Sequence, residues 1–276
     1  MTSTVIDNDG VGLAVSVVGD GPDLLFVHGL GSAQVLWQPL ISSLSNRFCC
    51  WSLDLRGHGA SDRAPGRYRP EDYTSDVVTV LDHIARPTIG IGHSLGGVSL
   101  AGAAAGGHQG LRALYILDSA LVRGAGERST SHAVFERQLA MVRRFQSERR
   151  PVDDYEAVLA EAPNPVGGTN RETMVPGQLR GRAESLSQMD PECMEVVVAG
   201  QRSDERTAAA LSLPIRVLAA DPDRGASFRP EHRDRLRQSS PQAEIETVHG
   251  VGHQLLMMQR FDEQVRSDLE AWLERT

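Results

Sequence analysis

The chain alternates short, uninterrupted apolar runs with segments of helical periodicity, and this rhythm constrains its fold more than any other feature. The apolar runs lie at residues 11–18, 23–28, 48–53, 88–92 and 111–117. They are too short to be complete helices, and each ends at or next to a glycine or an aspartate. Such runs are typical of strands buried on both faces of a parallel sheet. The rhythm therefore predicts an α/β fold with a doubly wound, mostly parallel sheet.

Helical patterns separate these strands, and one long segment interrupts the rhythm. Predicted helices lie at 35–44, 73–84, 95–105, 133–145, 153–159, 230–238 and 261–273, and further strands at 215–219 and 244–248. Between residues 122 and 211 only amphipathic helices and proline- or glycine-containing loops are expected. We therefore predict an α/β core made of residues 1–121 and 212–276, with residues 122–211 inserted as a helical cap.

Charge and composition exclude several classes of function. The chain has 276 residues and a net charge of −8, which argues against nucleic acid or an anionic membrane surface as a partner. All 28 basic residues are arginine, so lysine nucleophiles, pyridoxal Schiff bases and P-loop phosphate binding are excluded. No apolar run reaches 18 residues, and the N-terminal residues lack the pattern of a signal peptide. We expect a cytoplasmic enzyme with a small-molecule substrate; the oligomeric state stays open.

The three cysteines offer neither a disulfide framework nor a zinc motif. Cys49 and Cys50 are adjacent in a predicted strand, so their side chains point to opposite faces, and Cys193 lies far along the chain. We predict three buried thiols in a reducing compartment.

One hexapeptide carries the strongest chemical signal. Residues 92–97 read Gly-His-Ser-Leu-Gly-Gly, directly after a predicted strand and before a predicted helix. A serine flanked by glycines two residues away on each side can occupy a tight, strained turn that exposes its Oγ atom at the sheet edge. The strand–turn–helix context makes Ser94 a candidate nucleophile.

A serine hydroxyl needs a base, and His253 is the best placed of the nine histidines. It follows the last predicted strand, in the segment His249-Gly250-Val251-Gly252-His253. A loop there reaches the carboxyl edge of the sheet, where Ser94 also emerges. The spacing of His249 and His253 imitates a metal-binding pair on a helix, but the intervening glycines argue against a helix and hence against a metal site.

The base in turn needs a carboxylate that fixes its tautomer. Asp118, Asp221 and Asp223 each follow a predicted strand, and all three can reach the same sheet edge. Position after the strand at 215–219 favours Asp221 or Asp223. Backbone N–H groups for a developing oxyanion are available at Leu30, within His28-Gly29-Leu30-Gly31, and at Leu95, the first residue of a helix.

Taken together, these segments resemble the α/β-hydrolase superfamily over nearly the whole chain. The matching segments, in family order, are HGLGS at 28–32, DLRGHGASD at 54–62, GHSLGG at 92–97, LYILDSA at 114–120, PIRVLAADPD at 214–223 and GVGH at 250–253. The resemblance implies Ser94 as nucleophile, His253 as base, and the N–H groups of Leu30 and Leu95 as the oxyanion hole. It places the acid on Asp223, although Asp118 matches a position that some relatives use. It also implies that no cofactor is needed.

The implied activity is hydrolysis of a carboxylic ester, lactone or thioester through an acyl-enzyme on Ser94. Hydrolysis of a C–C bond, acyl transfer and cofactor-free dioxygenation use the same fold and stay open as alternatives. A ligand-binding receptor or pseudo-enzyme that retains the triad is an alternative of another class. An ester assay of the wild type beside Ser94→Ala separates these classes.

Substrate choice is expected to lie in the cap. Phe135, Met141 and Phe145 are candidates for an apolar acyl pocket, whereas a stripe of this kind is also common in ordinary core packing. Gln254 follows the histidine where family members often carry an aromatic or small apolar residue, which leaves the polarity of the pocket open.

Overall fold

The structure is a computed structural model that describes residues 2–122, 132–199 and 210–276. This part of the chain forms an eight-stranded sheet with the order β1-β2-β4-β3-β5-β6-β7-β8. The strands are β1 (Thr2–Asn8), β2 (Val11–Val18), β3 (Asp23–Val27), β4 (Cys49–Leu53), β5 (Thr88–His93), β6 (Leu111–Leu117), β7 (Ile215–Ala219) and β8 (Glu244–Thr247). Along this order the strands from β4 to β8 are parallel to one another, whereas β2 is antiparallel to both β1 and β4. This mostly parallel sheet confirms the predicted fold class.

The antiparallel edge of the sheet was not expected from the sequence. Strands β1 and β2 form a hairpin whose last pair is Asn8 with Val11. The two residues between them, Asp9 and Gly10, both have positive φ angles, 53° and 79°. This is the backbone of a type I′ turn, for which Asp-Gly is a preferred sequence. The Asp9–Gly10 dipeptide is therefore a signal that predicts this hairpin.

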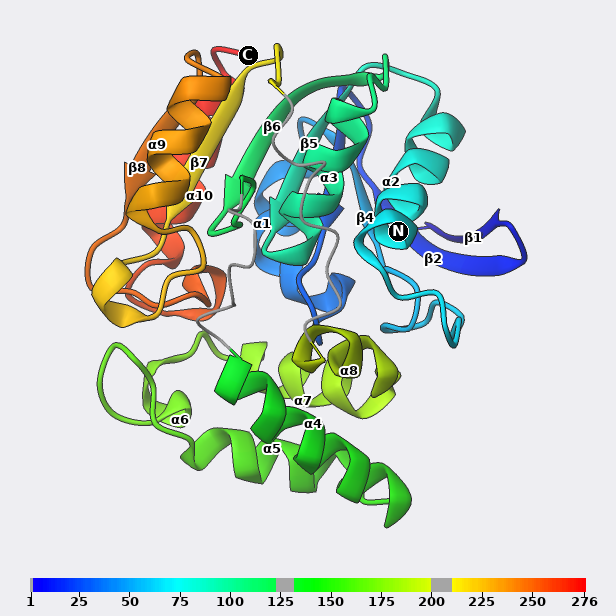
Figure 1. The fold of residues 1–276 in the computed structure, drawn as a ribbon, viewed down its shortest axis with the longest axis vertical. Helices are drawn as coiled ribbons and strands as arrows, with labels where there is room; N and C mark the ends of the chain where they lie inside the picture. The colour runs from blue at the N-terminus through cyan, green and yellow to red at the C-terminus, as the bar shows by residue number, and fades with distance from the viewer. Residues whose placement is uncertain (1, 123–131, 200–209) are drawn as a thin grey trace.

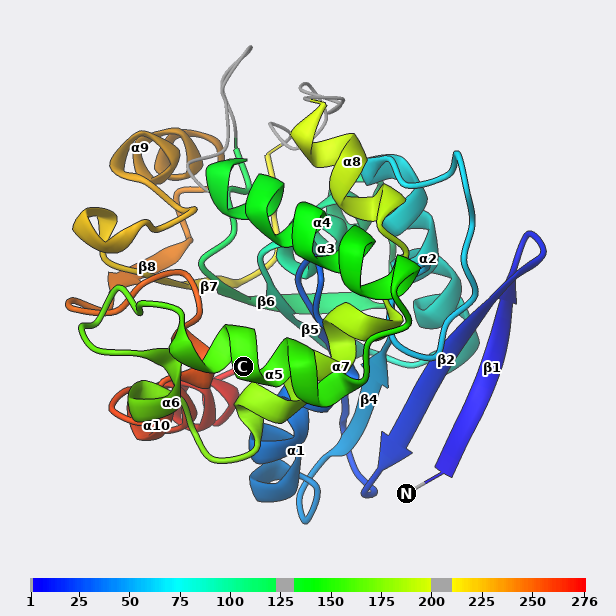
Figure 2. The same ribbon diagram turned by 90° about the horizontal axis from the view of Figure 1, so that it is seen from below.

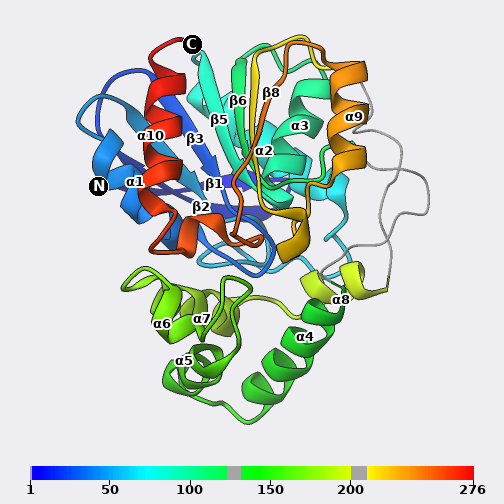
Figure 3. The same ribbon diagram turned by 90° about the vertical axis from the view of Figure 1, so that its left-hand side faces the viewer.

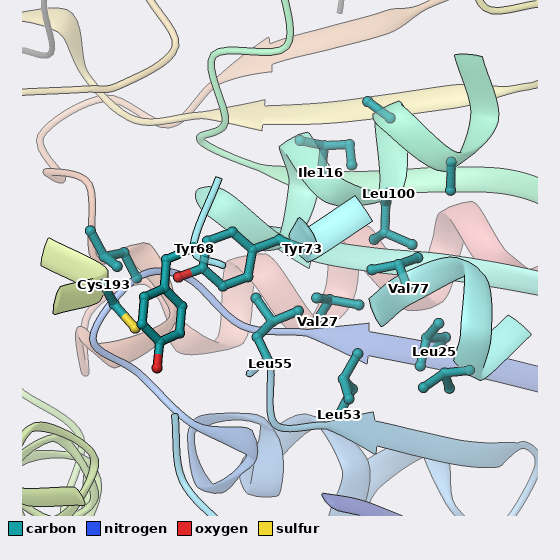
Figure 4. Packing of buried hydrophobic residues seen from close by; sticks show 14 of the residues in the cluster. Leu25, Val27, Leu53, Leu55, Tyr68, Tyr73, Val77, Leu100, Ile116 and Cys193 are labelled. Atoms are coloured by element: carbon teal, nitrogen blue, oxygen red, sulfur yellow. The ribbon is translucent and has the colours of Figure 1, made fainter. Parts of the chain in front are cut away.

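Helices cover both faces of the sheet because its central strands are apolar on both sides. The helices α1 (Gln38–Leu44) and α10 (Asp262–Leu273) lie on one face, and α2 (Pro70–Ile84), α3 (Leu95–Ala105) and α9 (Pro230–Ser239) on the other (Figure 3). In β3, Leu24 and Phe26 belong to the core with α1 and α10, whereas Leu25 and Val27 belong to the core with α2 and α3. Figure 4 shows the second of these cores.

Five described helices between β6 and β7 form a separate layer at the carboxyl ends of the parallel strands (Figures 1 and 2). They are α4 (His132–Ser147), α5 (Val152–Glu161), α6 (Asn170–Thr173), α7 (Gln178–Gln188) and α8 (Glu192–Val198). The helices predicted at 133–145 and 153–159 correspond to α4 and α5. The predicted insertion also includes residues 123–131 and 200–209, which lie outside the described residues.

The helical layer is joined to the core by buried polar and apolar contacts. The Tyr68 hydroxyl donates to Oδ2 of Asp190 over 2.7 Å, and the Asp190 N–H donates to the carbonyl of Gly57 over 2.8 Å. Cys193 of α8 packs beside Tyr68 and Tyr73 (Figure 4). A Cβ atom on Gly57 would lie 2.6 Å from Sγ of Cys193, so glycine permits this close approach.

All three cysteines are free and buried, as predicted. The predicted helix at 35–44 begins as the 3₁₀ helix η1 (Gln34–Trp37) and continues as α1. Within the described ranges, no helix combines the length and apolar character needed to cross a membrane.

Candidate active site

Ser94 occupies the turn between β5 and α3 with φ 51° and ψ −116°. A positive φ is uncommon for a residue with a side chain and stores on the order of 1–3 kcal/mol of strain. The neighbouring glycines make the turn possible. A Cβ on Gly92 would lie 2.6 Å from the Gly97 nitrogen, and one on Gly96 would lie 2.1 Å from the carbonyl oxygen of Val27. The strained turn predicted from the sequence is therefore present.

His253 lies against Ser94, in the loop between β8 and the 3₁₀ helix η4 (Leu255–Met257). Its Nε2 atom is 3.0 Å from Ser94 Oγ. The loop depends on its glycines: Gly250 has a φ of 82°, and a Cβ on Gly252 would lie 2.8 Å from the carbonyl oxygen of Arg224. The Gly-Val-Gly-His segment thus carries the histidine to the serine, as predicted.

Asp118, and not Asp223, lies against His253. Oδ2 of Asp118 is 2.6 Å from Nδ1 of His253. Because an ionised carboxylate only accepts hydrogen bonds, Nδ1 is the protonated nitrogen, and Nε2 is left to accept from the Ser94 hydroxyl. The two ring nitrogens of His253 therefore contact Asp118 and Ser94, and the prediction that Asp223 is the carboxylate beside His253 is wrong.

Asp118 is fully buried at the end of β6 and is held by backbone donors. The N–H groups of Ala220, Ser227 and Phe228 donate to its carboxylate over 3.0, 2.7 and 3.1 Å. Burial raises the pKa of Asp118, but the hydrogen bond and charge of His253, together with the backbone donors, outweigh it and lower the pKa below its usual value. The carboxylate is therefore ionised beside the histidine.

Asp221 and Asp223 have other surroundings because the chain turns directly after β7. Asp221 caps the 3₁₀ helix η3 (Pro222–Arg224) by accepting from the Asp223 N–H, and its other oxygen accepts from the Gly250 N–H over 2.7 Å. Asp221 thus braces the loop that precedes His253. The turn leaves Asp223 exposed.

The segment after β3 lies beside Ser94 and is fixed from two sides. The N–H of Gly31 donates to Nε2 of His58 over 3.1 Å, and the carbonyl of Gly31 accepts from Nη1 of Arg182 over 2.5 Å. Leu30 precedes this clamped peptide. Leu95 is the first residue of α3, so its N–H has no acceptor within the helix. The contact made by His58, a residue of the segment at 54–62, was not predicted from the sequence.

Three buried histidines near the site are held neutral. The pKa of His58 is lowered to about 3, mainly by burial and secondly by repulsion between its protonated form and a protonated His28. Burial likewise lowers the pKa of His28 to about 4, and burial followed by the charge of His253 lowers that of His93 to about 3. Nε2 of His93 donates to the carbonyl of His253 over 2.9 Å, and the two rings lie 4.7 Å apart between centroids. His93 therefore holds the backbone of His253 in place; the position directly before Ser94 was its only sequence signal.

A small cavity opens onto Ser94 and His253. It is also lined by Gly29, Leu30, Ser32, His93, Phe135, Arg182 and Gln254. Its empty space is about 250 Å³, a volume that includes space open to solvent. The cavity therefore brings residues of the sheet edge and of the helical layer together around Ser94.

Only one of the three predicted pocket residues lines this cavity. Phe135 does so, whereas Phe145 is buried against Tyr155 with an edge-to-face ring contact of 4.9 Å. Met141 packs against the apolar core and does not line the cavity. The reason is helical geometry: Phe135 lies near the start of α4, and the later residues of that helix face its neighbours in the helical layer. Ser32 and Arg182 also line the cavity and were not predicted from the sequence.

Comparisons with known proteins agree with this architecture. A family model described as the alpha/beta hydrolase family matches residues 24–267, a range that includes Ser94, Asp118 and His253. The chain is 39% identical over 92 residues to the 2-(acetamidomethylene)succinate hydrolase of Mesorhizobium japonicum, covering 33% of this chain and 33% of the relative. It is 36% identical over 81 residues to 3-oxoadipate enol-lactonase 2 of Acinetobacter baylyi, covering 29% of this chain and 30% of the relative.

The aligned segments thus span about a third of these relatives. Solved structures extend the likeness in fold to the whole chain. E-2-(acetamidomethylene)succinate hydrolase matches with a TM-score of 0.75 and 22% identity, covering 99% of each chain. Because the family model matches most of the chain, from residue 24 to residue 267, the chain belongs to the alpha/beta hydrolase family.

Proposed function

We propose that the protein is a serine hydrolase that cleaves a carboxylic ester, lactone or thioester through an acyl-enzyme on Ser94. The observation that carries this proposal is the continuous chain of hydrogen bonds from Ser94 Oγ through His253 to Asp118. The hydroxyl of serine is a weak nucleophile until a base accepts its proton, and this arrangement supplies the base and its orienting acid. The hydrolase, lactonase and esterase names among the relatives support the same class.

In the proposed reaction Ser94 Oγ attacks the substrate carbonyl while Nε2 of His253 accepts the hydroxyl proton. The ionised Asp118 stabilises the imidazolium that forms. The oxyanion is stabilised by the backbone N–H groups of Leu30 and Leu95. Collapse of the tetrahedral intermediate expels the leaving group, which takes the proton from His253. Water then attacks the acyl-enzyme with His253 again as base, releasing the acid and restoring Ser94.

The neutral state of the surrounding histidines favours this chemistry. A cationic His93, with its ring 4.7 Å from that of His253, would oppose formation of the imidazolium. Because burial keeps His93 neutral at pH 7, Asp118 acts on His253 without that opposition.

We further propose that residues 122–211 act as a cap over this site. Two cavity-lining side chains support the proposal, because Phe135 comes from α4 and Arg182 from α7. The buried Tyr68–Asp190 hydrogen bond anchors the same layer to the core.

The proposed function is tested by measuring hydrolysis of short-chain methyl esters, thiophenyl esters and lactones. The wild type is compared with Ser94→Ala and with Ser42→Ala, which removes an exposed serine of α1. We expect Ser94→Ala to lower kcat by at least about 10³-fold and Ser42→Ala to leave it unchanged. Equal activity of Ser94→Ala and the wild type would exclude Ser94 as nucleophile.

A second candidate reaction is amide hydrolysis by the same residues. The name of one relative, 2-(acetamidomethylene)succinate hydrolase, contains an acetamido group, and this favours the candidate. Adding N-acetyl amides to the substrate panel distinguishes the two: the candidate requires turnover of amides that depends on Ser94.

A further inference from the structure

Arg182 is a buried cation at the wall of the cavity that contains Ser94. It lies on α7 with 6% of its surface exposed, and it lines the same cavity as Ser94 and His253. Among the residues that the structure describes, no aspartate or glutamate forms an ion pair with it. The mechanism proposed above assigns no step to this charge.

Two other arginines of the chain do have acidic partners, in contrast to Arg182. The buried Arg56 pairs with the buried carboxylate of Asp76 through contacts of 2.6 to 3.0 Å. Arg180, two residues before Arg182 on α7, is half-exposed and pairs with several acidic side chains. Elsewhere, then, a buried guanidinium has an acid beside it, whereas Arg182 has none within the described ranges.

The lack of an acid partner has an energetic consequence. Removing a cation from water without a counter-ion is strongly unfavourable. Burial lowers the pKa of Arg182 to about 10, so the guanidinium is still charged at pH 7. The cavity therefore contains a fixed positive charge that an anionic ligand would compensate.

The hydrogen-bonding groups of the cavity have capacity for such an anion. A guanidinium carries five N–H donors. Arg182 directs one to the carbonyl of Gly31 and one to Oε1 of Gln138, both of them neutral acceptors. Ser32 also lines the cavity, is 2% exposed, and its Oγ has no hydrogen-bond partner among the described residues. A residue with a buried cation and a residue with an unused hydroxyl thus line the same cavity.

A purely structural role would account for only part of this arrangement. The bond from Nη1 to the carbonyl of Gly31 fixes the peptide next to Leu30, and a neutral donor would suffice for that bond. It explains neither the uncompensated charge nor the unpartnered hydroxyl of Ser32. A carboxylate fits both, because its two oxygens can accept from a guanidinium and from a hydroxyl at once.

We propose that Arg182 and Ser32 form a subsite for a free carboxylate on the substrate, so that the preferred substrates are small esters, lactones or thioesters that carry a second, ionised carboxyl group. This proposal rests on the proposed function, because the reacting bond is the one presented to Ser94. Because Ser32, Ser94 and Arg182 line the same cavity, we expect a short carbon chain between the reacting bond and the free carboxylate.

The test compares monomethyl malonate, succinate and glutarate with neutral methyl esters in which a methyl ketone replaces the carboxylate, such as methyl levulinate for monomethyl succinate. The ratio of kcat/KM for each anionic and neutral pair is measured for the wild type, Arg182→Gln, Arg182→Lys and Ser32→Ala. Arg180→Gln is the matched control, since Arg180 lies on the same helix and has its own acidic partners.

We expect the wild type to prefer the monoanion for at least one chain length and Arg182→Gln to lose roughly 10- to 150-fold of that preference, the range for a hydrogen bond to a charged group. Arg182→Lys should retain part of the preference, Ser32→Ala should lose a smaller part, and Arg180→Gln should behave as the wild type. Equal losses on both esters in Arg182→Gln would overturn the subsite and leave the hydrolase in place.

Binding to Ser94→Ala tests the subsite independently of turnover. Calorimetry with the same monomethyl esters compares Ser94→Ala with the double variant Ser94→Ala/Arg182→Gln, and thermal melting checks that both are folded. Binding that depends on Arg182, without turnover by the wild type, would overturn the proposed hydrolysis and keep the subsite. Binding that is absent, or unchanged by Arg182→Gln, would overturn the subsite.

Discussion

Replacing Asp118 by asparagine tests the corrected position of the acid. In the structure Oδ1 of Asp118 accepts from the N–H groups of Ala220 and Phe228, and Oδ2 accepts from Ser227 N–H and His253 Nδ1. An asparagine has only one carbonyl oxygen for these two positions. If it takes the place of Oδ1, its NH₂ group faces His253 and favours the tautomer protonated on Nε2, which cannot accept the proton of Ser94.

If the asparagine oxygen takes the place of Oδ2 instead, the NH₂ group faces the backbone donors of Ala220 and Phe228, which destabilises the loop. Either orientation impairs the base. The wrong tautomer costs about 10⁴-fold in kcat in serine proteases of the Ser-His-Asp type. We expect a loss of roughly 10²–10⁴-fold for Asp118→Asn.

Asp223→Asn is the matched control, because it makes the same chemical change at the exposed residue that sequence analysis favoured. It should change kcat by less than about threefold, since exposed substitutions of this kind have small effects. The assay is kcat on one short-chain ester, with circular dichroism and thermal melting on each variant. A crippled Asp223→Asn beside an active Asp118→Asn would refute the reasoning.

Three further predictions concern stability, the clamped peptide and substrate choice. The pKa values of three buried histidines are depressed: His28, His58 and His93. The unfolded chain therefore binds more protons below about pH 6.5, so the free energy of unfolding should fall as pH decreases toward 4, by about 1.4 kcal/mol per pH unit for each such histidine. His58→Leu should lower kcat about tenfold, because it leaves the Gly31 N–H without its acceptor. Phe135→Ala should change the relative kcat/KM among acyl chains, whereas Phe145→Ala should cost about 3–5 kcal/mol of stability and leave those ratios alone.

Each of these predictions has a direct check. Urea unfolding between pH 4 and 7 measures the first, and a free energy of unfolding that is independent of pH would contradict it. For the second, His58→Gln should recover part of the loss because its amide oxygen is an acceptor, and full activity of His58→Leu would contradict the clamp. For the third, uniform kinetic losses in Phe135→Ala would assign that residue to packing alone.

The sequence predicted the parts of the site that depend on local conformation. Ser94 was identifiable because its turn is specified by Gly92 and Gly96, which are its close neighbours along the chain. The loop that carries His253 was identifiable for the same reason, since Gly250 and Gly252 shape it. The alternation of apolar runs was sufficient for the parallel part of the sheet.

The parts that depend on packing between distant segments were not predicted. Asp118 and Asp223 both follow strands that end at the same edge, and the choice between them depends on the turn at η3, which directs Asp223 to solvent. Arg182 reaches the cavity only because α7 packs over the peptide at Gly31. Phe135 and Phe145 belong to one helical stripe, and only the packing of α4 determines which of them faces the cavity.

The central claim, that Ser94 is the covalent nucleophile of this fold, is tested most directly by labelling with a fluorophosphonate probe and mapping the adduct by peptide mass spectrometry. The account predicts one adduct per chain, located on Ser94, together with no labelling of Ser94→Ala and greatly slowed labelling of Asp118→Asn. An adduct on another residue, or undiminished labelling of Ser94→Ala, would contradict the account.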